Sequence, residues 1–358
     1  MSDASAKASA LRHGAAQLSE ITVDTYNADL RDGDGFVGDR ASRRAFVALV
    51  EDWRQRLRKS GHEDPLGEIS ARDLKKKKLD KVLVDGEPEA AALVHSATED
   101  FAQELAAVIR RFLRLKEWRE TQTILVGGGF RASRLGELAI GRAGLLLKTE
   151  GHAVKLEPIR YHPDEAGLVG CVQLAPSWIF SGHDSILAVD IGGNNIRAGL
   201  IGLNLKKAKD LSAARVRASV LWRHADDRPS RDNTIAKLAE MLCELIELAE
   251  KDEYALAPFV GIGCPGLIRD DGSIDRGGQN LPGNWEAKSF NLPDRIRELI
   301  PSIGGHQTEV VVHNDAVIQG LSAVPYMRKT SNWAILTIGT SLGNAHFSVR
   351  TNSSKPQR

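Results

Sequence analysis

The stretch ILAVDIGGNNIRAGLIGL, residues 186–203, decides the fold of this chain. Its apolar runs at residues 186–189 and 196–202 predict two buried β-strands on either side of a glycine turn. Gly192 and Gly193 let the backbone bend sharply, so that the N–H groups of the turn face one side and suit a phosphate. An ordinary hairpin turn is the competing interpretation, because glycine turns between strands are common.

Four later motifs follow this hairpin. They are VGIGCPGLI (260–268), NLPGNW (280–285), VVVHNDAVIQGLSA (310–323) and WAILTIGTSLGNAHF (333–347). Together with the hairpin they resemble the first part of a ROK-family sugar kinase (repressor, open reading frame, kinase), in the family's own order. The resemblance implies an α/β, two-lobed ribonuclease-H-like fold of the actin and hexokinase ATPase type, with ATP, Mg²⁺ and a sugar as ligands.

The segments before residue 185 resemble later parts of the same family. TILVGGGFRASRLGELAIGRA (123–143) is similar to its adenosine-binding strand, glycine turn and helix, and HPDEAGLVGCVQLA (162–175) to its final helix. In ordinary members both follow the second phosphate hairpin, whereas here they precede the first. We therefore expect a circularly permuted chain with its joint at residues 181–184, which is tolerated where the old termini lie close together at the surface. A fusion of two unrelated fragments is the alternative.

This order predicts the domain organisation. We expect a disordered segment at 1–18, the larger lobe at 19–183, the smaller lobe with the phosphate hairpin and catalytic residues at 184–325, and the start of the larger lobe with a polar tail at 330–358. Residues 19–30 alternate as in a strand that completes the sheet of the terminal hairpin. Residues 41–59 and 90–115 have the apolar spacing of helices.

The resemblance implies nucleotide contacts in three glycine-rich segments. They are Asp190, Gly192, Gly193, Asn194 and Asn195 in the first hairpin, Gly339, Thr340, Ser341 and Gly343 in the second, and Gly127, Gly128 and Gly129 after the adenosine strand. Asp190 would hold Mg²⁺ through water. A dinucleotide fold also uses a glycine run after a strand, but the G-x-G-x-x-G spacing is absent.

The family's catalytic base corresponds to Asp315, which would accept the proton of a sugar hydroxyl as its oxygen attacks the γ-phosphate. Asn314 would bind neighbouring hydroxyls. The competing interpretation for both is a helix N-cap, which Asn and Asp favour. The remaining sugar contacts implied by the resemblance are Gly272, Ser273, Asn280 and Glu68, and for Glu68 the alternative is a surface carboxylate at a helix start.

Two family features are missing. No Cys-x-Cys or Cys-x-x-Cys pair occurs, so no zinc ligands are assigned. The Gly-Glu-x-x-Gly-His segment, which should follow the second hairpin, has no counterpart. The three cysteines are Cys171, Cys243 and Cys264, and their apolar surroundings predict buried thiols.

Composition is that of a globular protein. The 358 residues are 42% hydrophobic and 27% charged, with a net charge of +1. This charge gives no argument for binding nucleic acid or an anionic membrane. The lysine run 75–78 is flanked by Asp73 and Asp80, which favours a solvated helix face. No signal or spanning segment is apparent, so we expect a cytoplasmic protein, able to form a homodimer.

Three functions follow. The first is ATP-dependent phosphorylation of a hexose, as in a glucokinase, with Asp315 as general base. The second is a sugar-sensing regulator, although the first forty residues show no helix-turn-helix pattern. The third is a catalytically weak protein that binds a sugar or a nucleotide. A hydride-transfer enzyme is opposed by the absent dinucleotide fingerprint.

Overall fold

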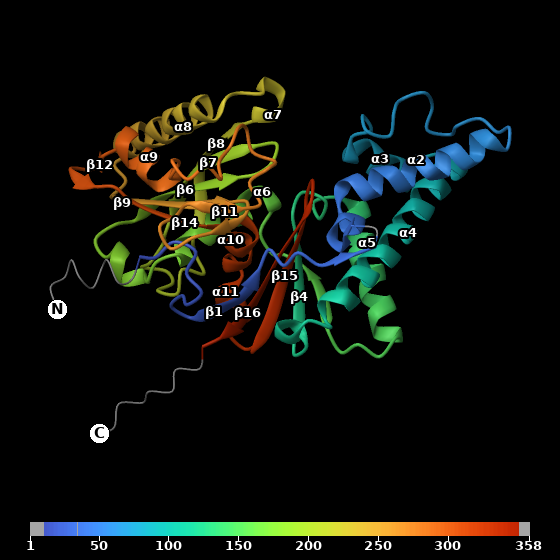
Figure 1. Cartoon of the computed structure of the whole chain (residues 1–358), viewed down its shortest axis with the longest axis horizontal. Helices are drawn as coiled ribbons and strands as arrows, with labels where there is room; N and C mark the ends of the chain where they lie inside the picture. The colour runs from blue at the N-terminus through green and yellow to red at the C-terminus, as the bar shows by residue number, and fades with distance from the viewer. Residues whose placement is uncertain (1–10, 34, 351–358) are drawn as a thin grey trace. The chain divides into compact units, whose positions relative to one another are not determined.

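The computed structural model describes residues 11–33 and 35–350 of the chain. These residues contain two five-stranded sheets and divide into two compact units (Figure 1). Unit 1 holds residues 11–27, 164–331 and 345–350, and unit 2 holds residues 28–33, 35–163 and 332–344. Among the helices of the described residues, none is both long and apolar enough to cross a membrane.

The sheet of unit 1 has the strand order β14-β9-β6-β7-β8. Its strands are β6 (Ser185–Ile191), β7 (Ile196–Gly202), β8 (Arg215–Trp222), β9 (Leu256–Cys264) and β14 (Glu309–Asn314). Strands β6, β7 and β8 pair antiparallel, whereas β9 and β14 run parallel to β6. The hairpin expected at residues 186–203 is confirmed as β6 and β7, and it includes the central strand of the sheet.

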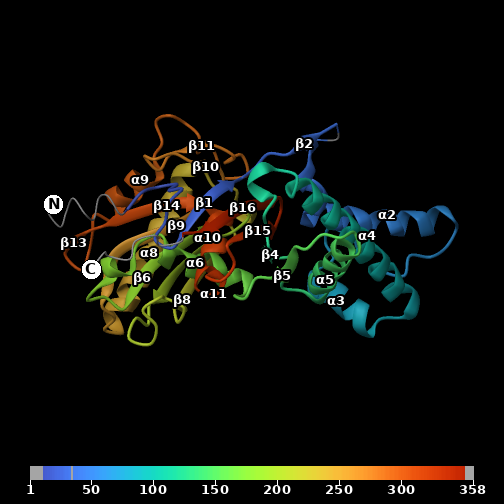
Figure 2. The same ribbon diagram turned by 90° about the horizontal axis from the view of Figure 1, so that it is seen from below.

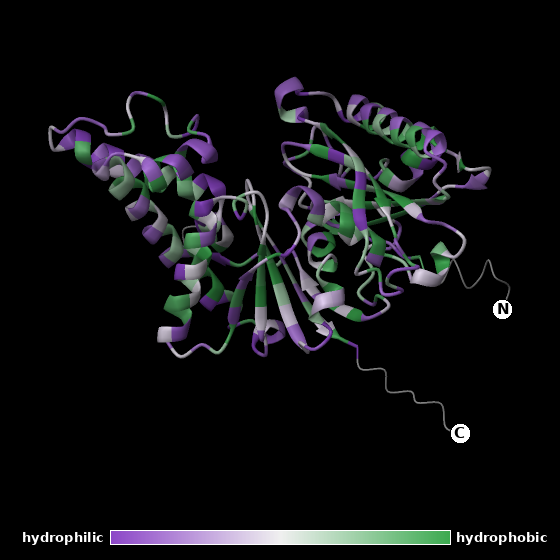
Figure 3. Ribbon diagram, turned by 180° about the vertical axis from the view of Figure 1, so that it is seen from behind, coloured by the Kyte–Doolittle hydropathy of each residue, from purple (hydrophilic) through white to green (hydrophobic). Residues whose placement is uncertain are grey.

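Helices cover both faces of this sheet because its central strands are apolar on both sides. They are α6 (Pro163–Gly170), α7 (His224–Asp227), α8 (Arg231–Lys251), α9 (Leu292–Leu299), α10 (Asp315–Leu321) and α11 (Val324–Met327). Side chains of α8 and α9 share one core with Leu187, Val189 and Leu200. On the opposite face, a Cβ atom at Gly199 would lie 2.7 Å from Leu168 of α6, so the glycine permits close packing. Figure 3 shows hydrophobic colour along these strands and mixed colour on α8.

Short elements complete unit 1. They are the strand pairs β10 (Leu267–Ile268) with β11 (Ile274–Arg276) and β12 (Ser302–Ile303) with β13 (His306–Gln307), and the 3-10 turns Cys171–Gln173 and Ser177–Phe180.

The second sheet has the strand order β1-β16-β15-β4-β5. Its strands are β1 (Ile21–Tyr26), β4 (Thr123–Gly127), β5 (Lys155–Pro158), β15 (Asn332–Ile338) and β16 (Leu342–Val349). β1 pairs antiparallel with β16, and β4 lies parallel between β15 and β5. The strand expected within residues 19–30 is confirmed as β1, which completes the sheet of the terminal hairpin.

The two sheets share one strand order, but the chain enters them at different points. In unit 1 the chain forms the hairpin β6–β7 first, then the third antiparallel strand β8, and then the parallel strands β9 and β14. In the second sheet the hairpin β15–β16 ends the described chain, and β1, β4 and β5 begin it. Ile21 pairs with Val349, so the start of β1 and the end of β16 lie side by side. The protein is therefore an α/β protein with two mixed five-stranded sheets, consistent with the two-lobed ribonuclease-H-like fold.

Unit 2 adds helices α2 (Arg43–Lys59), α3 (Lys76–Asp85), α4 (Pro88–Phe112) and α5 (Arg134–Thr149), the short pair β2 (Arg31–Asp32) with β3 (Gly35–Phe36), and the 3-10 helices Val37–Ala41 and Lys116–Trp118. The helices expected at residues 41–59 and 90–115 are confirmed as α2 and α4. The Ser42 side chain accepts the N–H of Ala45 and caps α2, as its residue type favours. The expected apolar stripe of α4 is buried, namely Phe101, Leu105, Val108, Ile109 and Phe112.

Two expectations need correction. Residues 1–10 and the tail 351–358 lie outside the described residues, but residues 11–18 contact β14, where the N–H of Gly14 donates to the carbonyl of Val312 at 2.9 Å. Cys171 and Cys264 are buried as expected, whereas Cys243 is exposed. Cys243 lies on the polar side of α8, because its neighbour Leu242 occupies the side that faces the core.

Candidate active site

Two carboxylates lie at the carboxyl ends of two parallel strands in the sheet of unit 1. Asp190 is near the end of β6, and Asp315 follows β14 as the first residue of α10. Between these strands lies β9, whose Gly263 is paired with Asp190 on one side and with His313 on the other. Figures 1 and 2 both draw α10 beside β14 and β9, which agrees with its contacts. The structure therefore gathers the two acids that the sequence separates by more than a hundred residues.

Burial makes ionisation of both acids unfavourable. It raises the pKa of Asp315 to about 6. The pKa of Asp190 rises to about 7, because of burial first and the negative charge of Asp315 second. Gly167 of α6 permits the close approach of this carboxyl group, since a Cβ atom there would lie 2.5 Å from Cγ of Asp190. Desolvated acids of this kind are typical of functional sites.

One cation lies beside the pair. Arg197 of β7 lowers the pKa of Asp190 by its positive charge, against the larger effect of burial. Its guanidinium also binds the carboxylate of Asp164 at 2.8 Å, and only 13% of the Arg197 side chain is exposed. The sequence interpretation missed this residue, although it stands seven positions after Asp190 in the same hairpin.

The turn between β6 and β7 leaves some of its amides without a protein acceptor, although its bend does not depend on glycine. Neither Gly192 nor Gly193 has a positive φ, so the bend itself does not require glycine. The N–H of Gly192 donates to the carbonyl of Asn195 at 2.8 Å. Among the described residues, the N–H groups of Gly193 and Asn195 donate to no protein acceptor. The value of glycine here is the open approach that it leaves to these amides.

Asn314 has the N-cap role that the sequence offered as the alternative. Its Oδ1 accepts the N–H groups of Ala316 and Val317 at 3.0 and 3.2 Å, and its Nδ2 donates to the carbonyl of Gly266 at 3.0 Å. The side chain is 2% exposed. Its backbone N–H is held by Nδ1 of His313 at 2.7 Å. Asn314 therefore fixes the start of α10, and with it the position of Asp315.

The predicted sugar loop divides into two regions. Asn280 lies beside the phosphate turn, since a Cβ atom at Gly193 would be 3.4 Å from its Cβ. Gly272 and Ser273 instead form the tip of the β10–β11 pair, where the Ser273 hydroxyl donates to Asp271 at 2.6 Å. The end of that pair nearest Asn314 is occupied by Gly266, so the structure does not bring the tip to the two acids.

Unit 2 contains the other two predicted nucleotide segments side by side. Gly128 has φ +80°, and a Cβ atom there would lie 2.5 to 2.7 Å from backbone atoms of Ile338. Phe130 N–H donates to the Ile338 carbonyl at 3.2 Å. The glycine run 127–129 after β4 and the turn after β15 therefore lie at one edge of the sheet, as the resemblance implied.

The turn between β15 and β16 is held by α2. Gly339 N–H donates to the carbonyl of Ser341 at 3.1 Å, and the carbonyl of Gly339 accepts the N–H of Arg43 at 2.9 Å. Thr340, Ser341 and Gly343 are half-buried at or next to this turn. Asn344, where the family more often has glycine, hydrogen-bonds both backbone groups of Ala28 and is structural.

The remaining predicted contact, Glu68, is exposed in the loop between α2 and α3 of unit 2. No contact of the described residues joins it to the acids of unit 1 or to the glycine segments of unit 2. A residue that the sequence interpretation did assign to solvent, Lys76, instead donates to the carbonyl of Gly129. Lys76, the second lysine of the run 75–78, thus contacts the glycine run 127–129.

The side chains around Asp190 suit Mg²⁺ better than a metal ion that needs three or more protein ligands. Among the described residues, no group of three or more His, Cys, Asp or Glu side chains could hold a metal ion. Mg²⁺ binds through one or two carboxylates and otherwise through water and phosphate oxygens. Asp190, whose ionisation is opposed by burial and by Asp315, is a suitable oxygen ligand.

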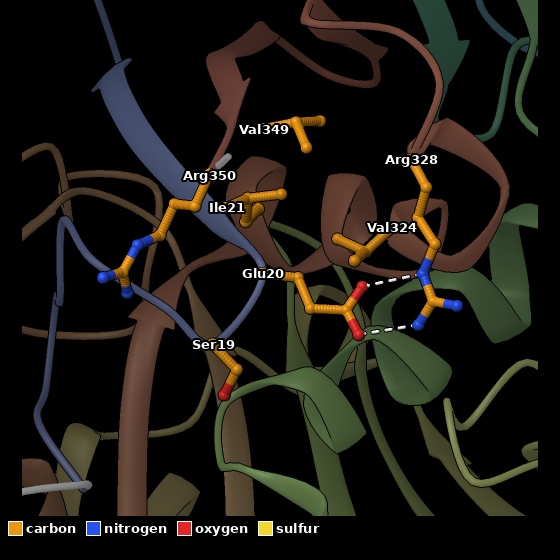
Figure 4. A pocket seen from close by; sticks show the side chains of 7 residues that line it. All are labelled: Ser19, Glu20, Ile21, Val324, Arg328, Val349 and Arg350. Atoms are coloured by element: carbon orange, nitrogen blue, oxygen red, sulfur yellow. Dashed lines mark hydrogen bonds and ion pairs between the residues drawn. The ribbon is translucent and has the colours of Figure 1, made fainter. Parts of the chain in front are cut away.

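A separate small pocket of unit 1 lies where the first and last strands pair (Figure 4). Its lining includes Glu20, whose carboxylate binds the guanidinium of Arg328 at 2.6 and 2.9 Å. Arg328 also binds Asp210 at 2.9 Å. Arg328 is thus bound by two carboxylates, so the pocket has the character of a structural junction between β1 and β16.

Comparisons with protein-family models and with curated proteins find no match. Among solved structures, the chain resembles a ROK hexokinase from Thermus thermophilus, with 22% identity and a TM-score of 0.31 over 45% of each chain. It also resembles an exopolyphosphatase from Cytophaga hutchinsonii, with 17% identity and a TM-score of 0.26 over 46% of this chain and 52% of that one. A third similar structure is the Ppx/GppA phosphatase of Aquifex aeolicus, with 14% identity and a TM-score of 0.25 over 52% and 55%.

The matches cover about half the length of these proteins. They show a distant structural resemblance to a ROK hexokinase and to a Ppx/GppA phosphatase.

Proposed function

We propose that this protein is an ATP-dependent sugar kinase of the ROK type, with Asp315 as its general base. The observation that carries the proposal is the half-buried pair Asp190 and Asp315, at the carboxyl ends of parallel strands beside a turn with unbonded amides. Ligands bind at that edge of α/β sheets.

The two acids suit different tasks. Asp315 has a pKa of about 6, so it is largely ionised at neutral pH. Because this pKa lies near neutral pH, the carboxylate can accept the proton of a hydroxyl group. Asp190 would orient hydrated Mg²⁺, which supplies positive charge to the transferring phosphate. The amides of Gly193 and Asn195 would bind phosphate oxygens, and Asn280 beside them would contact the sugar.

The resemblance gives unit 2 the nucleotide's other contacts. In this proposal the amides and hydroxyls of residues 339–341 bind phosphate, and the glycine run 127–129 lets the backbone approach the adenosine closely. The tight contact of Gly128 with Ile338 supports a rigid surface at this edge.

A second candidate is a protein that binds a sugar or nucleotide without useful turnover. The engagement of Asn314 as an N-cap, with Gly272 and Ser273 away from the acids, favours it. Three of the predicted sugar contacts would then contribute nothing to catalysis.

We also propose that the chain is a circular permutation of the kinase order. The support is that both sheets share one strand order while the second is completed by the first strands of the chain. Joining residue 358 to residue 1 and opening the chain between Gly182 and His183 restores the ordinary order. This variant should fold cooperatively, with far-ultraviolet circular dichroism and sugar-dependent activity like those of the natural chain. Failure to fold would contradict the proposal.

The decisive experiment measures ADP release from Mg²⁺-ATP with glucose, mannose, fructose, N-acetylglucosamine, N-acetylmannosamine and allose, in the natural chain and in Asp315→Asn. Release that depends on one sugar and disappears in the variant supports the kinase. Binding of a sugar or of ATP by calorimetry, with no release from any sugar, would favour the second candidate. Light scattering would test the expected homodimer in the same preparation.

A further inference from the structure

The carbonyl groups of the phosphate turn in unit 1 are held by one neighbouring segment. Nε2 of His224 lies 2.8 Å from the carbonyl oxygen of Gly192. The next residue of that segment, Ala225, donates its N–H to the carbonyl of Asn194 at 3.2 Å. Both contacts come from the single turn of α7, which directly follows strand β8.

Holding these carbonyls determines where the amides point. A planar trans peptide bond fixes its C=O and N–H groups opposite one another, so a donor that holds one carbonyl also fixes the direction of the next residue's N–H. Gly192 and Asn194 have theirs in α7, and the carbonyl of Asn195 has the N–H of Gly192. The N–H groups of Gly193 and Asn195 are thereby left for a ligand.

The position of His224 is itself fixed. The side chain is buried, with 2% exposure, and its ring packs edge-on against Trp222 at a centroid distance of 5.9 Å. Trp222 Nε1 donates to Asp227 at the end of α7 at 2.6 Å. Since a carbonyl oxygen can only accept, Nε2 of His224 carries a hydrogen and donates it to Gly192.

We propose that His224 is a positioning residue for the phosphate turn, aligning the amides of Gly193 and Asn195 through its hydrogen bond to Gly192. This inference rests on the proposed function, because the ligand of those amides is taken to be the phosphate of ATP. His224 touches no reacting atom. Its effect is on the affinity for the nucleotide, and turnover at saturation changes less.

Two substitutions separate the hydrogen bond from the packing of the ring. His224→Gln supplies an amide N–H donor but no ring, and His224→Phe supplies a ring but no donor. If the hydrogen bond aligns the turn, the Phe variant binds Mg²⁺-ATP about tenfold more weakly and the Gln variant retains most of the affinity. If His224 only fills space, Phe retains the affinity and Gln loses it.

The experiment combines two readouts on the full-length chain. Calorimetry with Mg²⁺-ATP gives affinity, and kinetics give KM and kcat for ATP, with melting temperatures showing that each variant is folded. Amide hydrogen exchange of residues 191–195 without ligand reports the order of the turn directly. We expect faster exchange in the Phe variant and near-normal exchange in the Gln variant.

Exchange in this turn that is unchanged in His224→Phe would overturn the positioning role, whatever the nucleotide result. Faster exchange in the Phe variant, in a protein whose natural chain binds no Mg²⁺-ATP, would keep the positioning role and refute the proposed kinase instead.

Discussion

The two glycine turns, one in each unit, share a hydrogen-bond pattern but differ in what surrounds them. In both, the N–H of the first glycine donates to a carbonyl two or three residues later, at 2.8 Å from Gly192 and 3.1 Å from Gly339. In both, the carbonyl of that glycine accepts a hydrogen bond from the first residue of a helix. The donor is the side chain of His224 for Gly192, and the backbone N–H of Arg43 for Gly339.

The difference lies in the acids. Asp190 precedes the first turn at the position that the buried Thr337 occupies before the second. Strand β14 is followed by Asp315, whereas β5, its counterpart in the shared strand order, is followed by Ile159 and Arg160. In the proposed function, unit 1 thus holds the acid that accepts the proton and the acid that orients Mg²⁺, and unit 2 binds the nucleotide through backbone amides and hydroxyls. Substitutions in unit 1 should change turnover, and those in unit 2 should change nucleotide binding or stability.

The largest effect is expected for Asp315→Asn. The amide keeps the oxygen that accepts the N–H of Ala316 at 2.9 Å, so the fold is retained. Loss of the base should reduce kcat about 100-fold or more, with sugar affinity within about threefold. Steady-state kinetics and sugar calorimetry measure both. The control is Asp232→Asn on α8. The side chain of Asp232 is 75% exposed, and this substitution should leave kcat unchanged. Near-normal turnover of Asp315→Asn would remove the proposed asymmetry between the units.

A second variant tests the backbone role of unit 2. Gly128→Ala places a Cβ atom 2.5 Å from the Ile338 carbonyl oxygen at a φ of +80°, so the unfolding free energy should fall by about 2 kcal/mol or more. The matched control is Gly129→Ala, whose Cβ would have only Nζ of Lys76 nearby, at 3.8 Å. Urea unfolding should show a change within about 0.5 kcal/mol for this control. Equal stability of the two variants would show that the close approach at Gly128 relaxes without cost.

The third comparison substitutes the two turns in the same way. Gly193→Ala meets only Asn280 at 3.4 Å, and Gly339→Ala only the Ser341 carbonyl at 3.5 Å, so both should fold normally. The added methyl group obstructs the approach of phosphate to the amides, and Mg²⁺-ATP affinity should fall about tenfold in each. Calorimetry measures the Mg²⁺-ATP affinity of both variants. Unchanged affinity in Gly193→Ala contradicts the assignment of the first turn, and a loss confined to it would mean that the second turn binds no phosphate.

The sequence was sufficient for the framework of the site. Apolar runs predicted the strands of the first hairpin, and the order of motifs placed Asp190 and Asp315 in one expected lobe, residues 184–325. Alternation in residues 19–30 predicted β1 as the completing strand. Each of these depends on local pattern or on strand order, which a single sequence carries.

The finer details depended on register and on alternative bonds. Which end of the β10–β11 pair approaches Asn314 is set by its pairing, so Gly272 and Ser273 could not be placed from composition. Asn314 could serve a sugar or cap a helix, and only the structure shows that Gly266 and α10 occupy it. His224 stands in WRHADD without any motif, because its function comes from chain folding back onto a turn thirty residues earlier.

The smallest expected effect is electrostatic and again sets unit 1 apart. The pKa of Asp190 is raised to about 7 in the folded protein. Its contribution to the unfolding free energy is therefore fully present below about pH 4, where the carboxyl group is protonated in both the folded and the unfolded protein. That contribution is lost as the pH rises through about 7. Asp190→Asn removes the loss, and it should raise the unfolding free energy by on the order of 1 kcal/mol at pH 8 without Mg²⁺ while having little effect at pH 4. Asp210 is the control of opposite sign, because the Ser212 hydroxyl lowers its pKa, and Asp210→Asn should slightly lower stability at pH 8. Thermal unfolding from pH 4 to 8 compares the two. If Asp190→Asn raises the unfolding free energy equally at all pH values, the packing of this side chain against Gly167, and not its charge, destabilises the fold. The chemical difference between the turns would then rest on Asp315 alone.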